Sequence, residues 1–170
     1  MIESFSVFLT LVRLLAVLGL VMPSIVLSDS VTGKVVAVSD GDTVTVLDRD
    51  QNRYKVRLQG IDAPEKRQPF GQRSKEHLSK LVFARNVFVE YNKRDRYGRI
   101  VGRVVLDGID ANLQQLHAGM AWHYKEYERE QPVAERTEYS RAERVARQNR
   151  NGLWVDVAPV PPWEFRRKTR

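Results

Sequence analysis

Residues 31–59 read VTGKVVAVSDGDTVTVLDRDQNRYKVRLQ and carry the clearest secondary-structure signal in the chain. β-Branched residues dominate the first third of this stretch. Apolar and polar residues then alternate over 43–47 and 54–58, as they do in half-buried strands. Asp40-Gly41 and a later polar run are turn signals between these segments. The stretch therefore predicts a three-stranded meander.

The chain after the meander changes its hydrophobic period and then returns to strand. Apolar residues of the segment 68–84, Phe70 among them, can share one face of a helix. Asn112 is placed to cap a short helix that Gly119 closes, and Pro132 stands near the start of a longer helix. The predicted helices are 68–84, 113–118 and 132–150, and the predicted strands after the meander are 87–91 and 99–106.

These elements predict an α+β fold that is mainly β. The expected architecture is a five-stranded OB-fold barrel with three covering helices, which is a common platform for nucleic-acid binding. A chain of 170 residues fits one domain with short appendages, and no internal repeat is visible. We expect the domain at residues 29–157.

The two ends of the chain differ from this domain in composition. Residues 5–27 are largely apolar and are followed by Ser28, a small residue that suits cleavage by signal peptidase. Residues 1–28 are therefore predicted to be a signal peptide, and the protein to be secreted or periplasmic. The alternative is an uncleaved anchor with the domain facing outward, because the stretch could span a bilayer; only then would a membrane be a partner. Residues 158–170 form a basic, proline-rich tail that we expect to be loosely ordered.

The chain is basic, with 28 Lys and Arg against 21 Asp and Glu and a net charge of +7. Residues 1–28 hold one Arg and one Glu, so the excess belongs to the remainder. Such a balance suits nucleic acid, because Lys and Arg release condensed counterions from phosphates, but it is also typical of a merely soluble basic protein. The absence of cysteine excludes disulfides, thiolate catalysis and cysteine-bound zinc. Three scattered histidines argue against a histidine metal cluster.

Three polar clusters lie at the ends of predicted strands: Asp40-Gly-Asp-Thr43, Arg57-Leu-Gln-Gly-Ile-Asp-Ala-Pro-Glu65 and Asp95-Arg-Tyr-Gly-Arg99. Taken singly, the first and third are ordinary charged turns. Together the clusters hold the groups that phosphodiester hydrolysis needs. Asp42 and Asp62 offer hard oxygen ligands for Ca²⁺ or Mg²⁺. Arg57 and Arg99 offer planar forks that match phosphate, and Glu65 remains as a candidate base.

The three clusters resemble, in the same chain order, the active-site segments of staphylococcal nuclease and its thermonuclease relatives. The similarity runs over residues 31–157 and includes Gly119-Met-Ala-Trp122 and Asn151-Gly-Leu-Trp154. The resemblance implies a nuclease that cuts DNA and RNA, breaks the bond to the 5′ oxygen and leaves 3′-phosphates. It implies one Ca²⁺ ion as cofactor, in preference to Mg²⁺, and no obligate protein partner.

The resemblance also implies a ligand set for that ion. Asp42 and Asp62 would bind it with their carboxylates, and the backbone oxygen of Ala63 would join them. Asp40 would support this set without touching the ion. The chain has Ala63 where the prototype has Thr. Because the ligand atom there is a main-chain oxygen, the substitution should matter little.

The remaining roles concern the substrate. By resemblance, Arg57 and Arg99 bind and neutralise the scissile phosphate, and Glu65 activates or orients the attacking water. The segment between Glu65 and the first helix is shorter than in the prototype, which bears on substrate preference and on the mobility of Glu65. Tyr97 and Tyr127 would bind substrate, and for Tyr127 packing in the core or at the rim of the barrel is the alternative.

Two other functions fit parts of this pattern. A barrel that only binds nucleic acid would be expected to have lost members of the arginine, glutamate and aspartate set, all of which are present here. A membrane-tethered nuclease differs only in the fate of residues 1–28. The sequence therefore favours an enzyme, a hydrolase of phosphodiester bonds.

Overall fold

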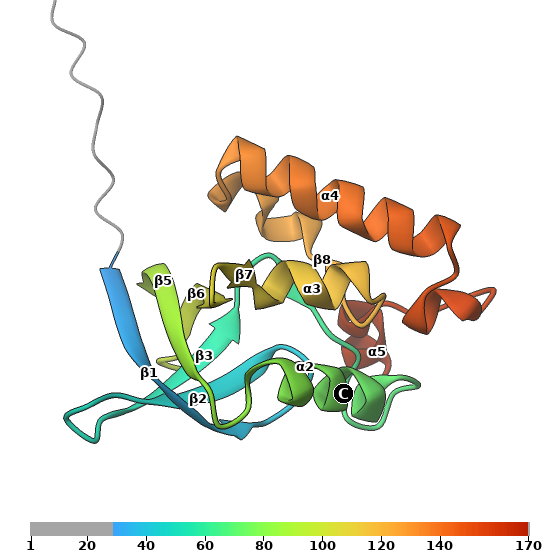
Figure 1. Ribbon diagram of the computed structural model, residues 1–170. Coiled ribbons are helices and arrows are strands. Elements are labelled where there is room, and N and C mark those ends of the chain that lie inside the picture. Colours follow the sequence, from blue (N-terminus) through green and yellow to red (C-terminus); the bar gives the residue numbers. More distant parts are fainter. Residues whose placement is uncertain (1–28, 170) are drawn as a thin grey trace, which may run out of the picture.

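A closed β-barrel forms the centre of the computed structural model, which describes residues 29–169 (Figure 1). Its strands are β1 (Asp29–Val38), β2 (Thr43–Leu47), β3 (Arg53–Leu58), β5 (Asn86–Arg94) and β6 (Ile100–Leu106). They lie in the order β3-β2-β1-β5-β6 with antiparallel neighbours, and the sheet closes because β3 also pairs with β6 in parallel. The five-stranded barrel predicted from the sequence is confirmed.

Three two-residue strands complete the sheets. β7 (Ile109–Asp110) lies beside β6, and β4 (Ile61–Asp62) pairs with β8 (Trp122–His123). Since β4 follows β3 after a two-residue turn, its pairing ties Asp62 both to the barrel and to the chain beyond the helices. The position of Asp62 is thereby fixed from two sides.

Alternation along the strands fills the barrel with aliphatic side chains. Val44, Val46, Val56 and Leu58 are buried, whereas the residues between them on β2 and β3 are more exposed. Register shifts in β1 and β5 mark irregular positions in the ladder, of the kind that bend strands so that a small barrel can close. Arg57 lies between two of the buried residues, so its side chain leaves the barrel on the other face of β3.

Helices cover one side of the barrel, and Figure 1 shows α3 between the barrel and α4. They are α2 (Gly71–Val82), α3 (Ala111–His117), α4 (Val133–Gln148) and α5 (Pro162–Lys168), with two 3-10 turns, η2 (Lys125–Glu130) and η3 (Gly152–Val155). Leu78 of α2, Leu116 of α3 and Tyr139 of α4 are fully buried in the main core. The first three helices correspond to the three covering helices predicted from the sequence.

Two local predictions were wrong. The first helix begins at Gly71, not at residue 68, because Phe70 has a left-handed backbone (φ 67°) that an α-helix cannot contain. Asn112 does not cap α3. Asp110 accepts the Leu113 N–H at 3.1 Å and fills that role, while Asn112 is buried and donates to the carbonyls of Gln59 and Gly102.

The tail is also more ordered than its composition indicated. Residues 162–168 form α5, and Trp163 packs beside the tryptophan cluster of Trp122 and Trp154. The Nε2 group of Gln68 donates a hydrogen bond to the carbonyl of Val160. The expectation of a loosely ordered tail was therefore wrong for this segment.

The signal-peptide prediction falls on residues 1–28, which lie outside the described part of the chain. Among residues 29–169, none of the helices is long and apolar enough to cross a membrane.

Candidate active site

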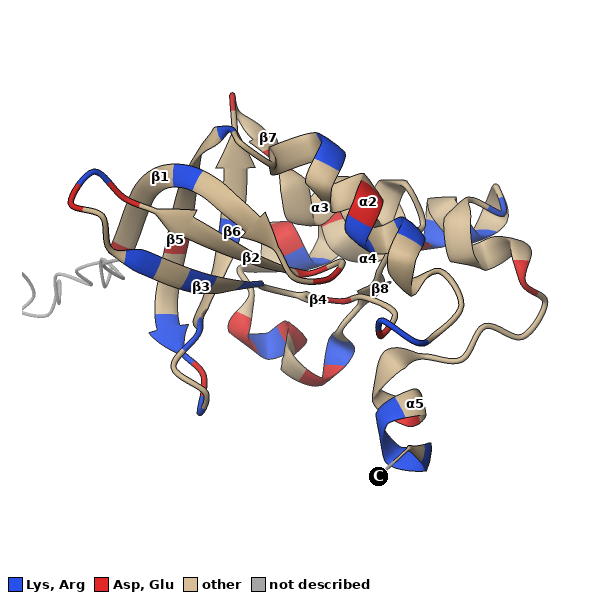
Figure 2. Cartoon of the chain, turned by 90° about the horizontal axis from the view of Figure 1, so that it is seen from below, with Lys and Arg blue, Asp and Glu red and all other residues tan. Residues whose placement is uncertain are grey.

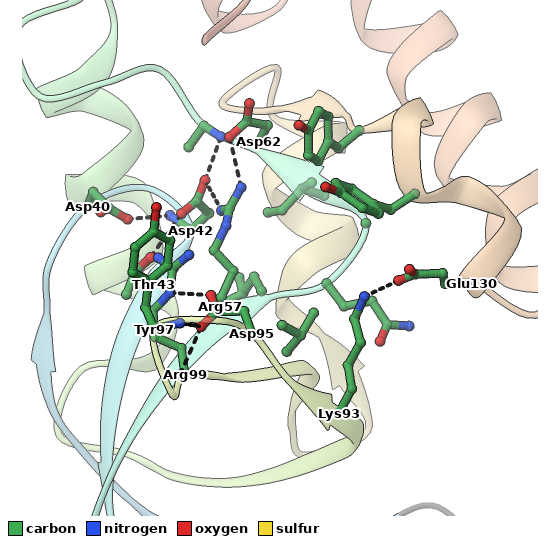
Figure 3. A pocket seen from close by; sticks show the side chains of 18 of the residues that line it. Asp40, Asp42, Thr43, Arg57, Asp62, Lys93, Asp95, Tyr97, Arg99 and Glu130 are labelled. Carbon is green, nitrogen blue, oxygen red and sulfur yellow. Dashed lines mark hydrogen bonds and ion pairs between the residues drawn. The ribbon is translucent and has the colours of Figure 1, made fainter. Parts of the chain in front are cut away.

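One pocket of about 620 Å³ lies at the mouth of the barrel, bordered by β3, β4, the β5–β6 hairpin, η2 and α5. All nine residues singled out from the sequence line it: Asp40, Asp42, Arg57, Asp62, Ala63, Glu65, Tyr97, Arg99 and Tyr127. Figure 3 shows that Asp42, Arg57 and Asp62 form one connected group, with Asp95 and Arg99 beside it. Segments that are far apart in the sequence thus meet around a single space.

The turn between β1 and β2 presents Asp42 at the pocket floor. Asp40 accepts the Asp42 N–H at 3.1 Å through its side chain, which fixes a tight turn. Gly41 packs against α2 so closely that a Cβ atom would lie 1.8 Å from the hydroxyl of Ser74, and its carbonyl accepts a 2.6 Å bond from Gln115. Helices α2 and α3 therefore hold the turn from behind.

The carboxylates of Asp42 and Asp62 are both buried, and a hydrogen bond joins Asp42 to the residue that follows Asp62. One oxygen of Asp42 accepts the N–H of Ala63 at 2.7 Å, and the other accepts the hydroxyl of Thr43 at 3.0 Å. Burial acts to raise the pKa of Asp42, but the positive charge of Arg57 and the Ala63 N–H outweigh it, so the pKa is lowered. Burial raises the pKa of Asp62 in spite of its arginine partners.

Asp40 differs from these two acids because no arginine contacts it in the described residues. Burial and the neighbouring negative charge of Asp42 raise the pKa of Asp40 to about 6. This carboxylate therefore takes up a proton more readily than Asp42 does.

Arg57 projects from β3, opposite Thr43 of β2, and its guanidinium contacts both buried acids. The distance from Nη2 to Asp62 Oδ1 is 2.8 Å, and Nη1 forms an ion pair with Asp42. Although burial opposes its charge, these two carboxylates raise the pKa of Arg57. Nη1 is buried against Asp42, so the two acids engage both terminal nitrogens of Arg57.

Arg99 reaches the pocket from the turn between β5 and β6. Asp95 accepts its Nε–H at 2.7 Å and its backbone N–H at 3.0 Å. Gly98 completes the turn with φ +77°, a conformation that other residues adopt only at a cost. No described residue bonds the two terminal nitrogens of Arg99, so they remain available to an anion. Tyr97, 68% exposed, stands under the same guanidinium.

The sequence analysis missed two side chains of α5: Arg166, which lines the pocket, and Trp163, which packs behind it. Arg166 donates to both oxygens of Asp62, at 3.2 and 2.8 Å, and to Glu65 at 2.7 Å. Trp163, three residues earlier, stacks on Tyr124 with ring centres 5.5 Å apart. A sequence signal existed: proline followed by Trp-Glu-Phe-Arg-Arg-Lys is compatible with the first turns of a short amphipathic helix.

An aromatic and basic rim continues from this point. Tyr124 and Tyr127 meet edge to face at 5.2 Å, and Lys93 lies over the ring of Tyr127 while it pairs with Glu130. Burial and the nearby Glu126 raise the pKa of Tyr124 to about 12, so its hydroxyl stays protonated at neutral pH. Tyr127 is 47% exposed, so a face remains open to a ligand.

The distribution of charge agrees with this geometry. Figure 2 shows Lys and Arg on β3, at the far end of β5 and on α5, three elements that border the pocket. From these three elements, Arg57, Lys93 and Arg166 line the pocket together with its acids. Such an arrangement can draw a polyanion to the mouth while the acids below attract a cation.

The donor chemistry of the pocket fits a hard divalent cation. Within residues 29–169 no three His, Cys, Asp or Glu side chains surround one point. An ion would therefore be held by oxygens of Asp42 and Asp62, with main-chain oxygen and water completing the set. Oxygen ligands of this kind suit Ca²⁺, which tolerates irregular coordination, and the lowered pKa keeps Asp42 ionised.

Known proteins resemble the chain over most of its length. A family model described as "Staphylococcal nuclease homologue" matches residues 55–156. An "Uncharacterized endonuclease" of Escherichia coli is 42% identical over 146 residues, which is 84% of this chain and 90% of that protein. An "Uncharacterized endonuclease" of Haemophilus influenzae is 42% identical and covers 82% of this chain and 75% of its own. "Probable staphylococcal-like nuclease CAN1" of Oryza sativa is 42% identical over 69% of this chain and 34% of its own.

Proposed function

Since the chain belongs to the staphylococcal nuclease homologue family, it is a nuclease, and we propose that it hydrolyses phosphodiester bonds of DNA and RNA with Ca²⁺ and leaves 3′-phosphates. The observation that carries the proposal is the meeting of two buried acids, two arginines and Glu65 around one pocket. The nine residues selected from the sequence come from well-separated segments, and all of them line this pocket.

Asp42 and Asp62 would hold the ion, together with the main-chain oxygen of Ala63. When bound, Ca²⁺ would supply positive charge to a non-bridging phosphate oxygen. Asp40 supports this set, because its side chain fixes the turn that carries Asp42. The Ala63 N–H bond to Asp42 links the segment of one ligand to the carboxylate of the other.

Arg57 and Arg99 would bind the scissile phosphate. The terminal nitrogens of Arg99 carry no hydrogen bond among the described residues, and Arg57 lines the same pocket, where it pairs with Asp42 and Asp62. Guanidinium groups match the paired oxygens of phosphate, and donors fixed in advance stabilise the charge that develops in the transition state. Tyr97 and Tyr127 border the same space and would contact the nucleotide.

Glu65 would take or direct the proton of the attacking water. Its side chain is 40% exposed and lies next to Asp62 through their shared partner Arg166. Ca²⁺ acidifies water only weakly compared with smaller ions, so a side chain has to assist. Pro64 stiffens the link between Ala63 and Glu65 and so helps to place this carboxylate.

The decisive experiment separates the metal ligand from the base. Glu65→Gln should lower kcat by ~10²–10⁴ at every Ca²⁺ concentration, the usual worth of general-base assistance. Asp42→Asn should instead shift the Ca²⁺ titration to higher concentration. Glu138→Gln, an exposed change on α4, is the matched control for lost charge. Full activity of Glu65→Gln at saturating Ca²⁺ would place the base elsewhere.

The substrate range is tested by digestion of single- and double-stranded DNA and RNA, with Ca²⁺ and with chelator. Cleavage of one polymer alone would restrict the proposal, and binding without cleavage of either would turn it into a binding-only barrel. The net charge of +7 should make binding to single-stranded DNA fall with salt, with a slope of about −0.7 per phosphate neutralised. A salt-independent affinity would contradict recruitment by charge.

The location of the enzyme is part of the same proposal. We propose that residues 1–28 are cleaved as a signal peptide and that residues 29–157 form the nuclease domain in a secreted or periplasmic protein. Amino-terminal sequencing of protein purified from its host should then begin near Asp29. An intact Met1 in a membrane fraction would support the anchored alternative.

A further inference from the structure

The last helix places a cation among the acids of the site. Arg166 of α5 bonds Asp62 with both terminal nitrogens and Glu65 with one of them. Its guanidinium is the sole donor to Asp62 Oδ2 among the described residues, whereas Asp62 Oδ1 is shared with Arg57. One full ligand oxygen and one face of Glu65 are therefore covered by this single side chain.

The segment that carries Arg166 is held mainly by side chains. Trp163 stacks on Tyr124 and meets Trp122 edge to face at 5.6 Å, and Gln68 bonds the carbonyl of Val160. α5 has seven residues and forms no strand or extended helix pair with the barrel. An attachment of this kind is easier to release than a strand of the sheet.

α5 also lies outside the part of the chain that defines the family. The family match ends at residue 156, six residues before α5 begins. Arg166 is thus a contact from outside the matched segment. It occupies Asp62 and Glu65 and can therefore act on the availability of these two acids.

Charge balance sets Arg166 and a divalent cation in competition for the same acids. Asp42, Asp62 and Glu65 face two guanidiniums, those of Arg57 and Arg166. A divalent cation that takes oxygens from Asp62 would stand next to the positive charge of Arg166 and compete for the same lone pairs. Removal of Arg166 leaves a surplus of negative charge of the size that a divalent cation neutralises.

We propose that α5 is an autoinhibitory latch: Arg166 caps Asp62 and Glu65, Trp163 holds the helix on Tyr124 and Trp122, and a divalent cation binds only as the latch leaves. This inference rests on the proposed function of Asp62 and Glu65. It predicts that the apparent Ca²⁺ affinity of the intact chain is weakened by the fraction of molecules in which the latch is closed.

The first test is Ca²⁺ binding measured by calorimetry, without substrate. Arg166→Gln should bind Ca²⁺ at least about fivefold more tightly than the unaltered protein, the lower range of typical coupling between sites. Arg167→Gln removes the same charge from an exposed position of α5 that forms no ion pair within the described residues, so it should leave the affinity unchanged. Trp163→Leu keeps Arg166 and should also tighten binding.

The second test follows the helix itself. The chain contains no cysteine, so Thr169→Cys creates a single site for a spin label at the end of α5. Ca²⁺ should increase the mobility of that label, and should have no such effect in a chain that also carries Asp42→Asn at the same Ca²⁺ concentration. Motion of the label that is insensitive to Ca²⁺ would overturn the latch.

The outcomes separate this inference from the proposed function. Equal Ca²⁺ affinity of Arg166→Gln and the unaltered protein, with both cleaving DNA, overturns the latch and leaves the nuclease mechanism intact. Loss of turnover by Arg166→Gln at saturating Ca²⁺ also overturns it, because Arg166 would then serve the substrate. Absence of Ca²⁺ binding and Ca²⁺-dependent cleavage in every variant overturns the proposed function, and the latch with it.

Discussion

Two arginines contact Asp62, and they belong to different kinds of structure. Arg57 rises from the middle of β3, where neighbouring strands fix its backbone on both sides. Arg166 comes from a seven-residue helix at the end of the chain, attached through Trp163 and a few polar contacts. Their side chains are 14% and 37% exposed. An arginine–aspartate ion pair can therefore be a fixed part of the fold when a barrel strand provides the arginine. The same ion pair can be released when a terminal helix provides it.

The largest difference is expected in stability. Arg57→Met leaves two buried carboxylates with fewer partners, and the free energy of unfolding should fall by about 3 kcal/mol. Arg166→Met removes a half-exposed group, and the change should stay within about 1 kcal/mol. Urea unfolding measures both values. Equal losses would mean that α5 is as integral to the fold as β3.

The next largest effect is expected on the turnover number when Arg57, the arginine of the barrel strand, is changed. Arg57→Lys keeps the charge but loses the planar fork, so kcat should drop by ~10²–10³. Arg53→Lys, an exposed change on the same strand, serves as the control and should behave like the unaltered enzyme. Near-normal kcat in Arg57→Lys would show that this arginine is not the phosphate clamp.

Removal of the Trp163 ring tests how strongly α5 is attached to the domain. Trp163→Ala removes the stacking on Tyr124, which should cost about 1 kcal/mol of unfolding free energy or less, since aromatic pairs are worth roughly that amount. Thermal unfolding of the intact chain provides the measurement. A loss of several kcal/mol would place Trp163 in the core of the domain and contradict a releasable helix.

Asp95, the ion-pair partner of Arg99, should give the smallest effect on stability. Burial acts to raise the pKa of Asp95, but its bonds to the side chain and backbone of Arg99 lower it below the usual value. The ionised form is thus favoured in the folded state. The resulting stability is present above the ordinary carboxyl pKa and disappears as pH falls through the lowered folded value.

Asp95→Asn should therefore destabilise the protein at pH 7 by about 0.5–1 kcal/mol, and the difference should shrink as pH falls below the ordinary carboxyl pKa. Asp50→Asn in an exposed turn is the control. A difference between Asp95→Asn and the unaltered protein that does not change with pH would mean that Asp95 acts through packing rather than charge.

The sequence predicted the barrel well because alternating valines and turn residues encode strands locally. It also selected side chains that the structure brings together, since Arg57, Asp62 and Glu65 lie within nine residues. Asn112 was misassigned because Asp110 offers an equally good cap two residues earlier, and only tertiary contacts show which side chain turns inward.

Arg166 could not be identified in the same way. Its partners lie 104 and 101 residues earlier in the chain, and no periodic pattern records a contact of that separation. The proline-rich and basic composition of the tail indicated weak order, yet the helix is positioned by contacts of Trp163 and Arg166 with residues far away in the sequence. Long-range contacts made by single side chains are invisible to patterns of neighbouring residues.

The parallel pairing of β3 with β6 has a consequence for the newly made chain. Residues 56–58 meet residues 100–102 in that pairing, and Arg57 and Arg99 stand at this seam. Contacts between such distant segments form late in folding, because a long loop has to close first. Before that closure, Arg99 is separated from Arg57 and Asp62 by more than thirty residues of chain. The pocket that holds all three is therefore expected only in a molecule whose barrel has closed.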